Sequence, residues 1–524
     1  MLDSMRVSPI AQYSPTTLSM DVGRHDAPVS RRTLATAQLP LSQRMSTYPP
    51  HTGGIQILKK RIVVCCDGTW QDGIIVNARW KYTNVLRLAR AVRHVDARVD
   101  PPVPQVVFYQ SGIGSANNIY SHFIDGATGA SLAEKVEEAY AFITQNYHPG
   151  DEILLFGFSR GAYTARMIAS LIGKIGVLSR TEMDHFSEIY IALQQLGSQD
   201  DLKSDGSYVQ TSERKKQLEI LAKWTGPDSP GCKRAKGGPE GFSVKCVGVF
   251  DTVGSVGLPE EITRNTKMKK MFGFQSTELG PHIQKAYQAL ALNERRADFN
   301  CAKFEQTEAG RKKNQVLRQC WFTGCHSDIG GGYPEPDLAN LTLAWMAAHI
   351  EDIICLDTAY LASLVEAVEP WGKLSPHDSC VGVFEIADRI QRQLPTEVDD
   401  PKTHEAIHPS VLQQTNLKDL TPELDEILNK NPSLVCKLLP LEDELRKNWK
   451  VTGTKTTAFP QPLSEAIKVH IPEAGDFRRW LGTILSRSRR ISAAAPRLRS
   501  SHYYYGGAIA SSLAAAYYYC VSRI

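Results

Sequence analysis

The sequence predicts an α/β fold with a mostly parallel central sheet flanked by helices. Short apolar runs, typical of buried strands, alternate along the chain with longer segments whose apolar residues recur at helical spacing. A glycine-flanked turn at residues 157–161 joins one such strand directly to the helix that follows it. Alternation of this kind favours parallel strands joined by right-handed crossovers.

The expected elements follow one another between residues 59 and 354. Apolar runs bounded by turn residues predict strands at 60–66, 105–109, 153–156, 244–250 and 316–325. Apolar residues that recur every three or four positions predict helices at 83–95, 131–147, 162–172, 183–196, 283–291 and 338–354.

Composition changes along the chain predict its organisation. Residues 1–58 are rich in Ser, Thr, Pro and Arg, so a disordered N-terminal arm is expected. A catalytic domain is expected over 59–354, with a polar and basic segment at about 180–242 interpreted as an inserted cap or loop. Proline-broken helical segments predict a helical C-terminal appendage at 355–476. The basic, Tyr- and Ala-rich tail at 477–524 is expected to be disordered.

Composition also limits the partners and the location. The 524 residues carry a formal net charge of only +4, which predicts no nucleic-acid partner. The cysteines lack zinc-type spacing, so no metal site is expected, and free thiols indicate a reducing compartment. No run approaches the roughly 20 apolar residues of a membrane span, so the cytoplasm is the expected location. Scattered arginines near the N-terminus leave mitochondrial targeting as an alternative. No pattern predicts an oligomeric state.

Ser159 is the candidate nucleophile. It stands in the pattern Gly157-x-Ser159-x-Gly161, between the apolar run 153–156 and the helical segment 162–172. Small residues two positions before and after a serine let strand and helix approach closely while the serine is held in a strained, exposed turn. The strand, turn and helix together predict a nucleophile elbow.

Asp251 and His326 are the candidate acid and base, because each follows a predicted strand as Ser159 does. Functional side chains of an open α/β sheet gather beyond the carboxyl ends of its strands, so the three are expected to meet. A serine needs a base to take its proton, and the base needs a carboxylate to orient it. The chain order serine, acid, histidine is that of α/β-hydrolases. Asp328 is the alternative acid, ranked lower because it lies close enough in sequence to bond the neighbouring glycine turn.

An oxyanion hole is expected beside Ser159. A tetrahedral intermediate needs at least two backbone N–H groups aimed at its negative oxygen. Arg160, at the start of a helix, is expected to supply one. Gly68 and Thr69, in the loop after the first strand, are expected to supply the other, since glycine permits close approach of the backbone to a substrate. No cofactor is expected.

Several motifs together resemble an uncharacterised α/β-hydrolase family, domain of unknown function 2235, which includes lipase effectors of bacterial type VI secretion. The matching segments are 67–70, 83–85, 157–162, 250–253, 291–295 and 321–333. The long glycine-rich segment after His326 is the most specific of them. The resemblance implies an α/β-hydrolase fold over about 59–354, with Ser159, Asp251 and His326 as nucleophile, acid and base. Phospholipase activity is a property of some relatives.

These patterns favour a serine hydrolase that cleaves carboxylic esters through an acyl-enzyme, with a lipid or phospholipid ester as substrate and transient contact with a membrane surface. One alternative is a non-catalytic binding module on the same scaffold. A second is a phosphatase of the haloacid-dehalogenase type, suggested by the run 65–69, in which Cys65 replaces the aspartate that would be the nucleophile.

Overall fold

The computed structural model describes residues 59–68, 82–112, 129–196, 211–236, 241–253, 277–381, 388–415 and 423–452. All of them belong to one compact unit that begins at Leu58. The predicted arm at 1–58 and the predicted tail at 477–524 lie outside these residues.

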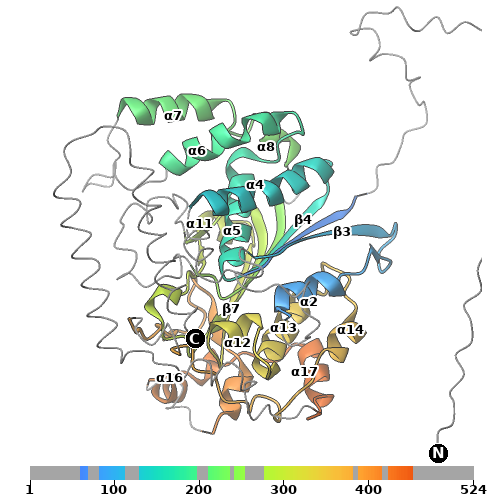
Figure 1. The fold of residues 1–524 in the computed structure, drawn as a ribbon, viewed down its shortest axis with the longest axis vertical. Helices are drawn as coiled ribbons and strands as arrows, with labels where there is room; N and C mark the ends of the chain where they lie inside the picture. The colour runs from blue at the N-terminus through green and yellow to red at the C-terminus, as the bar shows by residue number, and fades with distance from the viewer. Residues whose placement is uncertain are drawn as a thin grey trace, which may run out of the picture. The chain divides into compact units, whose positions relative to one another are not determined.

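Eight strands form one central sheet in the described part of the chain (Figure 1). They are β1 Arg61–Cys66, β2 Val95–Asp96, β3 Val103–Gln110, β4 Glu152–Phe158, β5 Val244–Phe250, β7 Ile283–Ala291, β9 Val316–Phe322 and β10 Glu405–Ile407. Their order in space is β10-β9-β7-β5-β4-β1-β3-β2. Every neighbouring pair is parallel except β2 and β3. The predicted fold class is therefore confirmed.

Helices cover both faces of this sheet. On one face pack α4 Gly129–Asn146 and α5 Arg160–Ile175, and on the other α2 Asn84–Ala91, α13 Asp337–Ile350 and α17 Pro440–Lys447. Successive residues of β1 enter these two cores alternately and are all buried, as expected for a central parallel strand. Among the described helices, none is long and apolar enough to cross a membrane.

The remaining elements are shorter or lie at the ends of the sheet. They are η3 Glu182–His185, α6 Phe186–Leu196, α7 Ser212–Ala222, α8 Pro230–Arg234, β6 Glu278–Leu279, η5 Ala297–Phe299, β8 Glu305–Gln306, α11 Glu308–Lys312, α12 His326–Gly330, α14 Thr358–Ser363, η7 Pro409–Gln413, α16 Leu424–Lys430 and η8 Pro432–Leu434.

The helix predicted at 283–291 is wrong, because these residues form strand β7 between β5 and β9. The spacing of Ile283, Ala286 and Leu290 suits a helix, but residues 286–291 are all buried. A parallel strand covered on both faces carries a continuous apolar run without alternation, so periodicity alone does not separate it from a buried helix.

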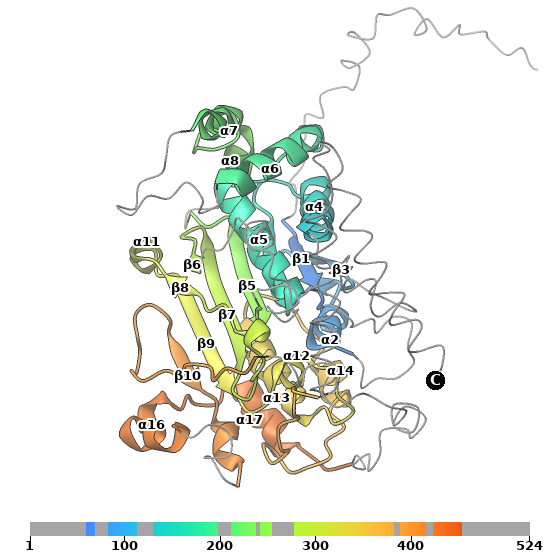
Figure 2. The ribbon, with the colours of Figure 1, turned by 60° about the vertical axis from the view of Figure 1, so that its left-hand side comes forward.

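The segment at 180–242 does not cap Ser159 in its described part. Its helix α8 packs on the C-terminal end of α5, where the Val177 N–H donates to the Gly231 carbonyl oxygen at 3.0 Å. Ser159 precedes the other end of this 16-residue helix, about 24 Å away along its axis. Figures 1 and 2 both show α6, α7 and α8 at the end of the sheet opposite α12. The described part of the segment interpreted as a cap or loop thus packs at the end of α5 far from Ser159.

The described part of the C-terminal segment belongs to the same compact unit as the sheet rather than forming a separate appendage. It contributes α14, α16 and α17 as helices, but it also contributes β10, which pairs with β9 at the edge of the sheet. Ile407 of β10 and Val411 pack with Trp321 of β9 in one buried cluster. Burial of these apolar side chains joins the segment to the sheet.

Candidate active site

Ser159 lies in a tight turn between β4 and α5. Its backbone has φ 59° and ψ −125°, a conformation that costs energy for any residue with a side chain. The N–H of Ser159 donates to the Phe250 carbonyl oxygen at 3.1 Å, which ties the turn to the end of β5. The strand, turn and helix predicted from the sequence are therefore present.

The two glycines around Ser159 are required by close contacts of the backbone. A Cβ atom at Gly157 would lie 2.4 Å from the Gly161 carbonyl oxygen. A Cβ atom at Gly161 would lie 2.2 Å from the Cys66 carbonyl oxygen. Both distances are far below van der Waals contact, so only glycine lets α5 approach the ends of β1 and β4 this closely.

The loop after β1 reaches the same place. A Cβ atom at Gly68 would lie 3.1 Å from the Cβ of Ser159. The Gly68 N–H donates to Asp67 Oδ1 at 2.7 Å, so this amide is engaged by the neighbouring carboxylate. Asp67 Oδ2 accepts hydrogen bonds from the hydroxyls of Thr83 (2.5 Å) and Tyr109 (2.6 Å). Asp67 thereby fixes the start of the loop beside Ser159.

The other two predicted oxyanion residues are Arg160 and Thr69. Arg160 begins α5 directly after Ser159, as predicted, and its side chain is partly buried. Burial lowers the pKa of this guanidinium to about 10. Thr69 lies outside the described residues.

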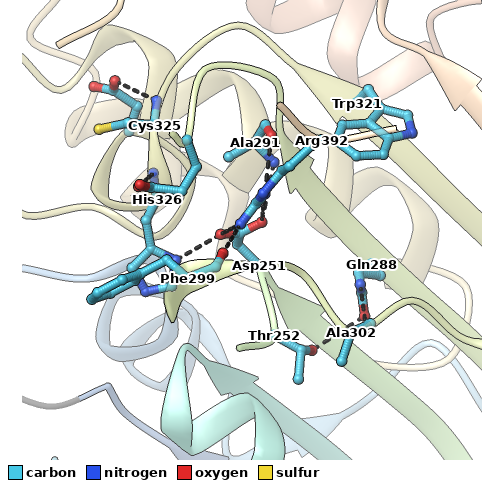
Figure 3. Close-up of polar contacts among 12 residues, drawn as sticks. Asp251, Thr252, Gln288, Ala291, Phe299, Ala302, Trp321, Cys325, His326 and Arg392 are labelled. Carbon is cyan, nitrogen blue, oxygen red and sulfur yellow. Dashed lines mark hydrogen bonds and ion pairs between the residues drawn. The ribbon is translucent and has the colours of Figure 1, made fainter. Parts of the chain in front are cut away.

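Asp251 and His326 contact each other at the carboxyl edge of the sheet. His326 Nδ1 and Asp251 Oδ2 are 2.6 Å apart, and Figure 3 shows the imidazole reaching the carboxylate. Both side chains are buried, and Asp251 has a positive φ of 40° directly after β5. The imidazole also lies 4.7 Å from the ring of Phe158, the residue before Ser159 (ring centroids). His326 Nε2 has no hydrogen-bond partner among the described residues.

Asp328, the alternative acid, is occupied elsewhere. Its Oδ2 accepts the Cys325 N–H at 2.9 Å, which caps the short helix α12. Its Oδ1 lies 2.7 Å from His377 Nδ1, and no described contact joins it to the imidazole of His326. Among the described contacts, Asp328 therefore bonds Cys325 and His377 rather than the glycine turn that the sequence suggested.

Arg392 and Glu294 are two site residues to which the sequence assigns no role. Arg392 forms a bidentate ion pair with Asp251, with N–O distances of 2.6 and 3.0 Å. Glu294 accepts the backbone N–H of His326 at 3.2 Å and pairs with Arg296. Arg392 follows Asp251 by 141 residues and lies in a stretch without periodicity, so no local signal marks it. Glu294 belongs to the segment 291–295, which carries part of the family resemblance.

The charge of Asp251 is set by competing effects. Burial by itself would raise the pKa of this carboxyl, but Arg392 and His326 outweigh it and lower the pKa to about 2. Asp251 is therefore ionised throughout the pH range in which a histidine titrates. Within the described residues, no group of three or more His, Cys, Asp or Glu side chains is arranged to hold a metal ion.

Acid is expected to weaken the folded protein partly through Asp251. Because its folded pKa of about 2 is below the ordinary value of 3.8, its ionisation stabilises the fold by about 2 kcal/mol above about pH 4, and this is lost as the pH falls to about 2. Urea unfolding of the wild type and of Asp251→Asn measures this contribution to the free energy of unfolding. The difference in unfolding free energy should shrink by about 1 kcal/mol between about pH 5.5 and about pH 3. A constant difference would contradict the assigned titration.

A family model matches residues 60–349 of this chain. Its description is "T6SS, Phospholipase effector Tle1-like, catalytic domain". An uncharacterised protein of Saccharomyces cerevisiae is 31% identical over 134 residues, which make up 23% of this chain and 18% of that protein.

Two solved structures are also similar. One is the Tle1 effector bound to the VgrG spike of the type 6 secretion system, with 19% identity and a TM-score of 0.26, covering 53% of this chain and 52% of that one. The other is an uncharacterised protein from Pseudomonas aeruginosa, with 15% identity and a TM-score of 0.29, covering 56% and 45%. The chain thus matches about half the length of each structure, and less than a fifth of the yeast protein.

Proposed function

Because this chain belongs to the family of Tle1-like T6SS phospholipase effector catalytic domains, we propose that it is a serine hydrolase of lipid carboxylic esters. Ser159 is the nucleophile, His326 the general base and Asp251 the acid that orients it. The observation that carries the proposal is the 2.6 Å contact between His326 and Asp251 at the sheet edge where the strained Ser159 turn also lies. Family membership alone supports the lipid substrate class, and the site geometry supports the serine mechanism.

The reaction begins with attack of Ser159 Oγ on the ester carbonyl carbon. His326 Nε2, which has no hydrogen-bond partner in the described part of the chain, takes the hydroxyl proton and then gives it to the leaving alcohol. Asp251 bonds the protonated Nδ1 of His326, so the lone pair that accepts the serine proton is on Nε2. The Asp251 carboxylate also stabilises the imidazolium that then forms. Water then hydrolyses the acyl-enzyme by the same proton path in reverse.

The oxyanion donors are assigned to the backbone N–H groups of Arg160 and Thr69. Arg160 follows the nucleophile at a helix N-terminus, where amide groups point outward and the helix dipole favours negative charge. Gly68 lets the loop lie against Ser159, and its own amide would join the hole only if its bond to Asp67 opened. Two aimed N–H groups are sufficient to stabilise the tetrahedral intermediate.

A fluorophosphonate probe and a substrate panel test this function. The full-length wild type is expected to form one covalent adduct on the peptide that contains Ser159, and to hydrolyse acyl esters or phospholipid vesicles without added Mg²⁺. The panel varies acyl length and headgroup, which defines the substrate class.

Two outcomes would point to the other interpretations. Absence of both labelling and turnover indicates a binding module on a hydrolase scaffold. Turnover of phosphate monoesters that requires Mg²⁺ and is lost in Asp67→Asn, while Ser159→Ala remains active, indicates a phosphatase. In the structure, the Asp67 carboxylate is bonded by Gly68, Thr83 and Tyr109, and Cys65 is buried in β1.

A further inference from the structure

Arg392 contacts both oxygens of the Asp251 carboxylate. Its Nη1 lies 2.6 Å from Oδ1 and its Nη2 lies 3.0 Å from Oδ2, the oxygen that also faces His326 Nδ1. Figure 3 shows the guanidinium and the imidazole approaching the carboxylate together. Asp251 is thus shared between two partners, one of them permanently charged.

The guanidinium is held rigidly in this position. It also donates to the Ala291 carbonyl oxygen at the end of β7 (3.0 Å) and to the Phe299 carbonyl oxygen (2.5 Å). The Ala291 N–H in turn donates to Asp251 Oδ1 at 3.1 Å. The ring of Phe299 packs edge-on against His326, with 5.1 Å between the ring centroids. Arg392 is only 3% exposed, so water screens these interactions weakly.

We propose that Arg392 is a positioning residue for ester hydrolysis: it fixes the Asp251 carboxylate, and through this carboxylate the orientation of the His326 imidazole. This inference rests on the proposed function, because it concerns the same nucleophile, base and acid. Arg392 lies beyond residues 60–349, so the C-terminal segment supplies a part of the site that the family match does not include.

The first effect of Arg392 is electrostatic. Its positive charge lowers the pKa of the buried Asp251 carboxyl, so the carboxylate that faces His326 Nδ1 stays ionised. Glu294 also lies beside His326, where it accepts the backbone N–H, and it is paired with Arg296. Cys301 faces Asp251 and Arg392, and burial raises the pKa of this thiol, so it stays neutral.

A second effect of Arg392 is geometric. Asp251 has a backbone conformation with φ 40°, which is unfavourable for a residue with a side chain. A bidentate guanidinium fixes the plane of a carboxylate as well as its position. Arg392 therefore presents Oδ2 to His326 in one orientation, which a single hydrogen bond would not ensure.

Substitution of Arg392 in the full-length protein tests both effects. In Arg392→Gln fluorophosphonate labelling of Ser159 should slow about a hundredfold, because the acid and base are no longer held in place. The NMR resonance of the His326 Nδ1 proton that bonds Asp251, assigned by its loss in His326→Gln, should disappear as well. Arg392→Lys keeps the positive charge but cannot form two parallel hydrogen bonds, so it should keep this resonance while labelling slows about tenfold.

Arg166→Gln is the matched control. Arg166 is a partly buried arginine that donates to the Ala302 carbonyl oxygen, and it makes no described contact with Asp251. Wild-type labelling with an unchanged Nδ1 resonance in folded Arg392→Gln, or an equal loss of both in Arg166→Gln, would overturn the proposal. If Arg392→Gln does not fold, an Arg392→Lys protein that labels at the wild-type rate would overturn it. Wild-type protein that never labels at Ser159 refutes the proposed function instead, and the Nδ1 resonance of His326 still reports the effect of Arg392.

Discussion

Replacing Ser159 by alanine is expected to lower ester turnover by about 10⁶-fold, roughly the loss seen when a nucleophile of this type is removed. The Ser159 hydroxyl is the only group that forms a covalent bond to the substrate in the proposed reaction. His326 and Asp251 alone should therefore give no partial activity. Fluorophosphonate labelling should disappear together with turnover. Because Ser159 is buried in the turn and small, the folded structure should persist, and thermal unfolding of the two proteins measures this.

Ser170→Ala on the same helix α5 is the control for this experiment. Ser170 is only partly buried and lies about 16 Å along the helix axis from the turn, so its removal should leave labelling and turnover unchanged. Turnover or labelling that survives in folded Ser159→Ala would place the nucleophile elsewhere.

Asp251→Asn is expected to lower turnover by about 10⁴-fold. The amide no longer holds the proton of His326 on Nδ1, and it carries no charge to stabilise the imidazolium. It also leaves the buried Arg392 without its anionic partner, which should cost about 3–5 kcal/mol of stability. Turnover must therefore be measured per folded molecule, with circular dichroism reporting the folded fraction at the assay temperature.

Asp328→Asn is the paired variant for this assignment. Its side-chain oxygen can still accept the Cys325 N–H, and the substitution removes the negative charge that faces His377. We expect turnover within about tenfold of the wild type and a stability loss of about 1 kcal/mol. If this variant, rather than Asp251→Asn, abolished turnover, Asp328 would be the acid.

Features determined over a few residues were predictable from the sequence. The turn at Ser159 needs glycine at two positions for steric reasons, and that need appears directly as Gly157 and Gly161. Asp251 and His326 could be identified because each follows a strand-like run, and parallel strands bring their carboxyl ends to one edge. The structure places these two side chains in contact, while their catalytic roles remain predictions.

The sequence could not show where the insertion and the C-terminal segment pack, because their positions depend on long-range contacts. The polar sequence of 180–242 resembles a cap, but Gly176 and Gly231 let α8 pack at the far end of α5. The prolines of 355–476 suggest an appendage, although Ile407 and its neighbours complete the core around Trp321. Polar residues indicate local exposure, and prolines indicate where a helix is interrupted. Neither indicates the surface on which a segment finally packs.

The sequence by itself determined the α/β alternation, the family, the Ser159 turn and the candidate acid and base, because each depends on local periodicity or on the geometry of a few adjacent residues. Only the tertiary structure decided that 283–291 is a strand, since a strand buried on both faces has no distinguishing period. It also decided that Arg392 binds Asp251, 141 residues earlier in the chain. An ion pair of this kind depends on where two distant segments pack, and a single arginine in an aperiodic stretch carries no local sign of its partner.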